Sequence, residues 1–135
     1  MPNAKGHSLL NLEIMKEAYC SEKVSEMLKK KGFDEPCMAF WEYELYEYSL
    51  YIAGDPMSNS DLEKELVDGW SATTHQMACA WVREKGYHIY TFRGVDYWVF
   101  EIQSLNEDWT YSLGALKEHD EAIEAALKYS LENLI

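Results

Sequence analysis

The fold is decided by residues 73–103, which read TTHQMACAWVREKGYHIYTFRGVDYWVFEIQ. Threonine at the start of this stretch can cap a helix, and apolar residues then recur at helical spacing until Gly86, a residue type that commonly ends helices. The stretch therefore predicts a helix over 74–85. Aromatic and β-branched residues dominate after Gly86, which predicts two strands over 87–93 and 95–103. The apolar positions of the helix are Met77, Ala78, Trp81 and Val82.

Two further elements follow these strands. Residues 107–113 have the composition of a third antiparallel strand. Residues 119–134 place apolar side chains along one side of a final helix. Acidic residues at the start of this helix suit the positive end of its dipole; they are Glu118, Asp120 and Glu121.

The first half of the chain has the same kinds of signal. Residues 21–31 predict a helix that begins at a serine and ends at Gly32. Residues 37–43 and 45–52 are dense in aromatic side chains and predict a pair of strands. The turn between these strands lacks an Asn-Gly pair, so the sequence leaves its position open.

Two segments are harder to assign. Leu9 to Tyr19 fits a helix by its apolar spacing and a strand by its alternation, and both assignments stay open. Residues 54–70 combine proline, serine, asparagine and several acids. This composition predicts a flexible acidic loop, with room for a short helix over 61–67.

The chain therefore predicts a single α+β domain over residues 1–135. The expected architecture is a two-layer sandwich, in which two to three helices lie on one face of an antiparallel sheet of four to five strands. The apolar sides of the helices need such a sheet to cover them. Both halves contain a helix, a lysine-glycine stop and aromatic strands, which leaves an ancient duplication open.

Charge and composition restrict the function classes. The chain has 135 residues and a formal net charge of −12, so its averaged field repels nucleic-acid phosphates and anionic lipid surfaces. We therefore expect no direct nucleic-acid binding and no membrane contact. The three cysteines are widely spaced and form no CxxC pair, which favours a reducing, cytoplasmic location over a disulfide framework or a zinc finger.

Few residues have the spacing of a catalytic site. His75 and Cys79 lie four residues apart on the predicted helix, so an imidazole could activate a thiol there. Residues 118–120 place three titratable groups in a row, which helix capping explains better than catalysis does. Phosphate-binding loops, dinucleotide fingerprints and metalloprotease motifs are absent from the sequence. We therefore expect no cofactor and no metal.

Residues 40–51, FWEYELYEYSLY, interleave aromatic and acidic side chains. Such a stretch could bind a cation, a sugar or a basic peptide through stacking and charge, or it could be an ordinary half-buried hairpin. The predicted binding residues are Trp41, Glu42, Tyr43, Glu44, Tyr46 and Glu47.

Three segments show a resemblance to other proteins: KKKGFDEPCMAF at 29–40, ATTHQMACAWVREKGYHIY at 72–90 and EHDEAIEAALKYSLENLI at 118–135. They resemble a group of small uncharacterised proteins from gut anaerobes and their phages. The chain departs from that group at two helix starts, where it has Thr73 in place of proline and Glu118 in place of threonine. The resemblance implies an accessory role in a virus or mobile element, and it implies no catalytic residues.

These observations leave three functions open. The first is a non-enzymatic accessory protein whose acidic, aromatic surface binds another protein with a basic surface. The second is a small hydrolase or ligand-binding enzyme that uses His75, Cys79 or the acids of residues 42–47. The third is a structural subunit that associates with itself, with a homodimer as the simplest form.

Overall fold

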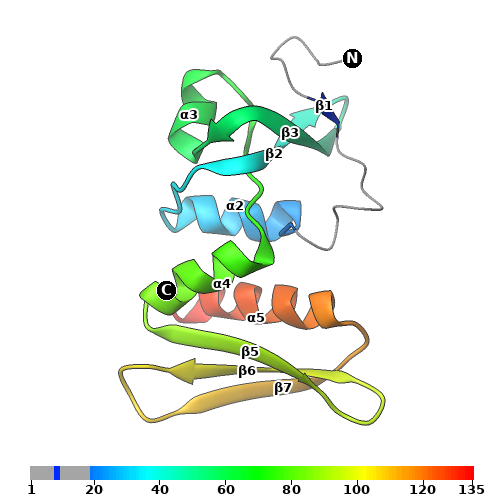
Figure 1. Cartoon of the computed structure of the whole chain (residues 1–135), viewed down its shortest axis with the longest axis vertical. Helices are drawn as coiled ribbons and strands as arrows, with labels where there is room; N and C mark the ends of the chain where they lie inside the picture. The colour runs from blue at the N-terminus through cyan, green and yellow to red at the C-terminus, as the bar shows by residue number, and fades with distance from the viewer. Residues whose placement is uncertain (1–7, 10–18) are drawn as a thin grey trace. The chain divides into compact units, whose positions relative to one another are not determined.

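The computed structural model describes residues 8–9 and 19–135 of the chain (Figure 1). The chain divides into two compact units, Met1–Thr74 and His75–Ile135. Each unit contains α-helices and an antiparallel sheet. Within the described residues, every helix is too short or too polar to cross a membrane.

The first unit contains a four-stranded antiparallel sheet in the order β1-β3-β2-β4. Its long hairpin consists of β2 (Cys37–Glu44) and β3 (Glu47–Met57). The short strands β1 (Ser8–Leu9) and β4 (Gly69–Ser71) extend the two edges of this hairpin. Gly69 is required where β4 meets β2, because a Cβ there would lie 1.8 Å from the carbonyl oxygen of Trp41.

Helix α2 (Glu22–Lys30) confirms the helix predicted over 21–31. It begins where the Ser21 hydroxyl accepts a hydrogen bond from the Val24 amide at 3.2 Å. It ends before Gly32, whose φ of +96° is the left-handed conformation that glycine adopts without steric cost. Lys29 then donates a hydrogen bond to the Gly69 carbonyl at 3.3 Å, which connects α2 to β4.

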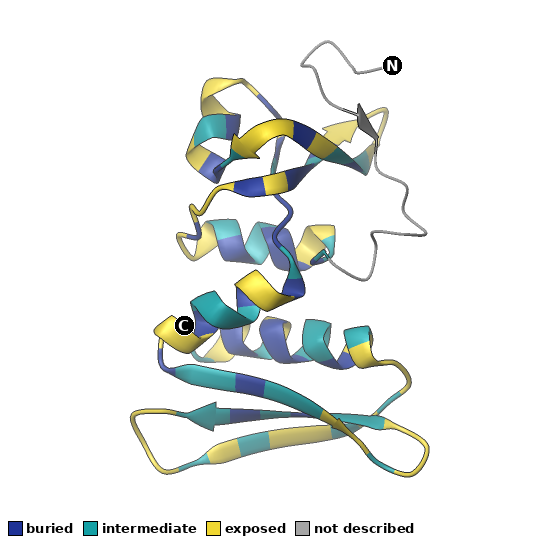
Figure 2. Cartoon of the chain, viewed as in Figure 1, coloured by how far each residue is buried: buried dark blue, intermediate teal, exposed yellow. Residues whose placement is uncertain are grey.

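The sheet of the first unit has a hydrophobic cluster on each side. One cluster contains Ala39, Leu50 and Ala72, with the partly buried Trp41 against it. The other contains Phe40, Ala53, Leu62 and Val67. Burial does not alternate strictly along β2 and β3, because side chains on both sides of the sheet pack against a cluster (Figure 2).

Most of residues 54–70, which the sequence assigns to an acidic loop, forms regular structure. This segment contains the end of β3, helix α3 (Asn59–Lys64) and the start of β4. A reciprocal capping box between Ser58 and Asp61 starts the helix, and Asp34 accepts two hydrogen bonds from Ser60. The loop prediction is therefore corrected for most of this segment, and the short helix that the sequence allows over 61–67 is found slightly earlier, at Asn59–Lys64. Two of the polar residues that suggest a loop, Ser58 and Asp61, cap this helix.

The second unit has the order α4 (His75–Glu84), β5 (Tyr87–Arg93), β6 (Trp98–Ser104), β7 (Thr110–Leu116) and α5 (His119–Asn133). The three strands form an antiparallel sheet, and both helices lie on one face of it (Figure 1). The buried side chains of this layer come from α4, β5, β6 and α5, whereas β7 has no fully buried residue. They include Ala78, Val82, Ile89, Phe100, Ile102, Ala122, Ala126, Leu127 and Leu131.

The α+β class and the antiparallel pairing are confirmed. The prediction of one sandwich with a single sheet of four to five strands is wrong, because the strands separate into a four-stranded and a three-stranded sheet. The physical reason lies in β4, which returns from α3 to pair with β2 and completes the first sheet before α4 begins. The ambiguous segment Leu9 to Tyr19 lies largely outside the described residues.

Candidate functional site

Strand alternation separates the binding residues that the sequence predicts in the hairpin. Trp41 pairs across the sheet with Leu50 and Trp70, and Tyr43 pairs with Tyr48. Directly paired residues point to the same side of a sheet. We call this side of the hairpin the aromatic face, defined by Trp41, Tyr43, Tyr48 and Trp70.

The three glutamates of the predicted site belong to the opposite side, which we call the glutamate face. Glu42 pairs with Ser49, and Glu44 pairs with Glu47. Glu42 is only 6% exposed, and Glu44 accepts a hydrogen bond from the Tyr51 hydroxyl. The predicted binding residues Trp41 and Tyr43 therefore do not share a face with Glu42 and Glu44, whose neighbours on the glutamate face are Phe40 and Tyr51.

Three rings of the aromatic face contact one another in a row, with their planes tilted by 57° between Tyr43 and Tyr48 and by 30° between Tyr48 and Trp70. The centroids of Tyr43 and Tyr48 are 5.1 Å apart, and those of Tyr48 and Trp70 are 4.8 Å apart. Both distances lie in the range of favourable aromatic pairs. Trp41 has a structural role on the same face, because its indole nitrogen donates a hydrogen bond to the Cys20 carbonyl at 3.1 Å.

Carboxylates from outside the hairpin surround this row. Burial raises the pKa of Tyr48, and the negative charges of Asp68, Glu26 and Glu22 raise it further. Asp68 is placed here by the backbone, because the Tyr43 amide donates a hydrogen bond to the Asp68 carbonyl at 2.7 Å. The aromatic row therefore lies in a negative field.

The row and its carboxylates have the chemistry of a cation site. A ring face attracts an ammonium or guanidinium group, and nearby carboxylates add charge to that attraction. Tyr43 is 40% exposed at the outer end of the row, so a cation can reach its ring from solvent. Glu26 is partly neutralised by Lys23 and Lys30, at 3.8 and 3.4 Å. Glu22 and Asp68 take part in none of the ion pairs found among residues 8–9 and 19–135.

The sequence does not identify the acids of this site. Glu22 and Glu26 look like ordinary residues of an amphipathic helix, and Asp68 lies in the segment assigned to a loop. Trp70 likewise lies outside the aromatic stretch of residues 40–51, so the sequence does not group it with Tyr43 and Tyr48. The pairing of β4 with β2 brings Trp70 and Asp68 to the aromatic face, and helix α2 supplies Glu22 and Glu26.

The turn between β2 and β3 has an unusual backbone. Leu45 and Tyr46 have φ angles of +51° and +68°. Two successive positive φ angles are typical of a type I′ hairpin turn, for which Asn-Gly is the favoured sequence. The side chains are 90% and 93% exposed, so burial does not compensate for the backbone cost. We call these two residues the hairpin tip.

The residues of the enzyme hypothesis have other roles in the second unit. His75 places its Nε2 atom 2.8 Å from a carboxylate oxygen of Glu124. Burial raises the pKa of the Cys79 thiol to about 11, although Arg83 acts in the opposite direction. Because the thiolate is the nucleophilic form, a thiol with this pKa reacts slowly at neutral pH.

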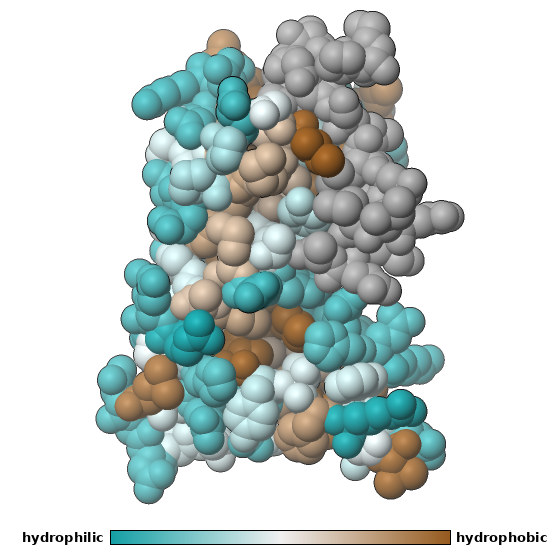
Figure 3. Space-filling view, viewed as in Figure 1, coloured by the Kyte–Doolittle hydropathy of each residue, from teal (hydrophilic) through white to brown (hydrophobic). Residues whose placement is uncertain are grey.

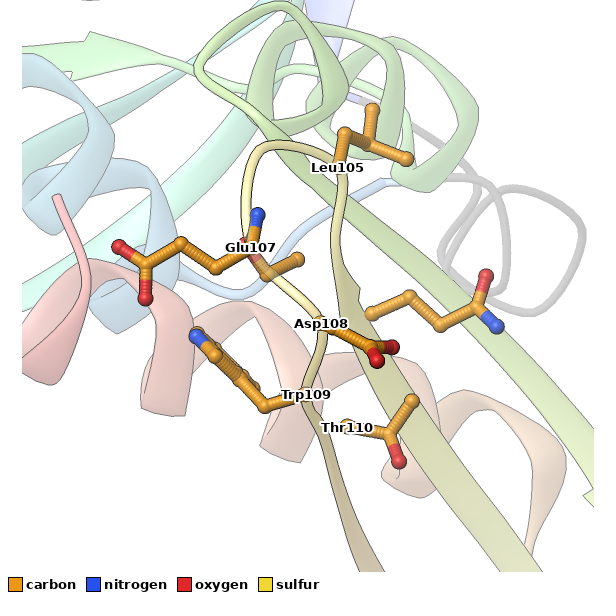
Figure 4. Close-up of a pocket in the computed structure, with 7 residues that line it drawn as sticks. Leu105, Glu107, Asp108, Trp109 and Thr110 are labelled. Carbon is orange, nitrogen blue, oxygen red and sulfur yellow. Dashed lines mark hydrogen bonds between the residues drawn. The ribbon is translucent and has the colours of Figure 1, made fainter.

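A shallow pocket of about 330 Å³ opens at the turn between β6 and β7. Its lining is mostly polar and includes Glu107, Asp108 and Trp109. Figure 4 shows the two carboxylates pointing to opposite sides of the loop, so they do not converge on one substrate atom. The pocket lacks the convergent polar groups that mark most ligand sites.

Hydrophilic side chains cover much of the face drawn in Figure 3, and hydrophobic residues appear there in small separate groups.

Comparisons with protein-family models, with curated proteins and with solved structures gave no match to this chain.

Proposed function

We propose that the first unit is a protein-recognition module that binds a lysine or arginine side chain of a partner at the aromatic face. The observation that carries the proposal is the row of tilted, contacting rings in the field of nearby carboxylates, formed by Tyr43, Tyr48 and Trp70. A basic side chain in contact with such a row gains about 0.5–1 kcal/mol at an exposed site and more where water is excluded.

The net charge of −12 supports a basic partner, because complementary charge accelerates the encounter of two proteins and disfavours acidic competitors. Within the described residues, Cys37 and Cys79 are free thiols, which agrees with action in a reducing, intracellular compartment. The role is that of a non-enzymatic accessory protein, as the resemblance to phage-associated proteins implies.

The hairpin tip supplies an apolar contact next to this cation site. Leu45 and Tyr46 directly follow the strand that carries Tyr43, and both are almost fully exposed. Exposed apolar residues on a strained turn are costly for a free protein, and such strain is concentrated at functional sites. The preferred ligand is therefore a segment with an apolar residue close to its lysine or arginine.

The test uses short peptides that are identical except for one central residue, which is Arg, Lys or Gln, with a leucine beside it. Binding is followed by the NMR shifts of the Trp70 indole proton and of the amides of residues 43–48. We expect the Arg and Lys peptides to shift these signals and the Gln peptide to leave them in place. Equal shifts with the Gln peptide would exclude cation recognition.

A matched pair of variants tests the carboxylates. E22Q/D68N removes one glutamate and one aspartate beside the aromatic row, and E107Q/D108N removes the same charges at the β6–β7 turn. If each carboxylate contributes about 0.2–1 kcal/mol, E22Q/D68N weakens peptide binding by roughly two- to thirtyfold. E107Q/D108N should retain the affinity. An equal loss in both variants would show that only the net charge matters.

A further inference from the structure

The starts of α4 and α5 bring two histidines and an aspartate of the second unit together. His75 is the first residue of α4, and His119 and Asp120 are the first two residues of α5. The Asp120 Oδ1 atom lies 3.2 Å from Nδ1 of His119 and 3.9 Å from Nδ1 of His75. One carboxylate oxygen therefore faces a nitrogen atom of each imidazole.

Glu124 prepares His75 to act as a metal ligand. Its Oε2 atom lies 2.8 Å from Nε2 of His75, a distance at which the Nε2 proton is donated to the carboxylate. In this tautomer the lone pair is on Nδ1, the nitrogen that faces Asp120. Metal-binding histidines have the same arrangement, in which a carboxylate fixes the tautomer and the orientation of the ring.

The spacing of the donor atoms suits a small divalent ion. Nitrogen and oxygen ligands at about 2.0–2.2 Å from zinc, separated by tetrahedral angles, lie roughly 3.3–3.6 Å from each other. The distances of 3.2 and 3.9 Å from Asp120 Oδ1 lie just below and just above this range. The ligand atoms of the two histidines and Asp120 do not all lie within 4.8 Å of one another. Metal binding therefore requires the His119 ring, whose side chain is 48% exposed, to leave its edge contact with Trp98 and turn toward His75.

The electrostatics of the cluster also favour a cation. Each helix N-terminus repels a cation with about half an elementary charge. Asp120 and Glu124 bring two full negative charges, which exceed the repulsion of the two helix ends. The side chain of His75 is 9% exposed, so its interaction with these carboxylates is only weakly screened by solvent.

We propose that His75, His119 and Asp120 bind a divalent transition-metal ion such as Zn²⁺, and that Glu124 orients His75. Two imidazoles and one carboxylate select a first-row transition ion over Mg²⁺ or Ca²⁺, which prefer oxygen ligands. Three protein ligands leave a fourth position for water. The sequence alone does not predict this site, because the two histidines lie on separate helices and in no metal-binding motif.

The test is titration of the whole chain with Co²⁺, whose visible absorption reports its ligands, followed by displacement with Zn²⁺ in a calorimeter. We expect one ion per chain. H119Q changes an exposed side chain and should weaken binding at least tenfold without unfolding the protein. E124Q should weaken binding by about ten- to a hundredfold, as loss of an orienting carboxylate typically does.

H88Q is the control, because His88 lies on β5 outside this cluster. It should bind the ion as the unchanged protein does, and circular dichroism confirms that each variant is folded. H75Q should abolish binding, but His75 is buried, so H119Q decides the question if H75Q unfolds. The absence of binding, or equal affinity in the unchanged protein and H119Q, would refute the site and leave His75 as an imidazole paired with carboxylates.

Discussion

Replacement of the hairpin tip by the favoured turn sequence, L45N/Y46G, should stabilise the protein. A left-handed conformation costs an L-residue about 1–2 kcal/mol, and asparagine and glycine avoid much of this cost. About a tenth of each original side chain is covered, which at roughly 25 cal/mol per Å² loses less than about 0.5 kcal/mol per residue. The greater freedom of glycine in the unfolded chain removes a further 0.5–1 kcal/mol or so. The net gain is about 1–2 kcal/mol.

Urea denaturation followed by circular dichroism measures this gain as a higher midpoint with an unchanged slope. L66G provides the control, because Leu66 is also exposed, has a φ of +60° and follows the C-terminal end of α3. It should add about 1 kcal/mol, as glycine does at such a position. A lower midpoint for L45N/Y46G, with L66G behaving as expected, would refute the assignment of strain to the tip.

Three further predictions concern stability. G69A should destabilise the first unit by about 2–4 kcal/mol in urea denaturation, because the new Cβ would overlap the Trp41 carbonyl; a change below about 0.5 kcal/mol would contradict the tight contact. S130A should raise the melting temperature by a few degrees, since the buried Ser130 hydroxyl makes no hydrogen bond within the described residues; a lower melting temperature would show that this hydroxyl has a partner. Burial raises the pKa of Cys37 and Cys79 to about 11, so the folded state holds both thiol protons more tightly than the unfolded state. The free energy of unfolding should therefore fall by on the order of 1–3 kcal/mol per thiol as the pH rises from about 9 to 11. Constant stability over that range would contradict the burial of these thiols.

Local signals in the sequence predict the elements of this fold well. Gly32 and Gly86 end their helices with positive φ angles, as their positions after apolar helical stretches predict. The strands of the second unit lie within a few residues of their predicted positions, because alternation and composition define them locally. The position of the first hairpin turn was open, because Leu45 and Tyr46 carry no turn signal.

The division into two sheets depends on pairing between distant residues. β4 is three residues long, and its pairing with β2 connects residues about thirty positions apart, which no local pattern shows. The same pairing places Trp70 and Asp68 beside the aromatic row of β2 and β3. The cation site is therefore predictable from sequence only for Tyr43, the one predicted binding residue that belongs to the row of rings.

The two observations at the hairpin can be separated by experiment. If the tip is an apolar anchor, L45N/Y46G gains stability and loses peptide affinity, while L66G gains stability and retains affinity. If the tip only connects the strands, both variants gain stability and retain affinity, and recognition depends on the aromatic row alone. A natural sequence that retains Leu45 and Tyr46 where Asn-Gly would be more stable favours the first outcome, because local rules of stability are most often broken where a function requires it.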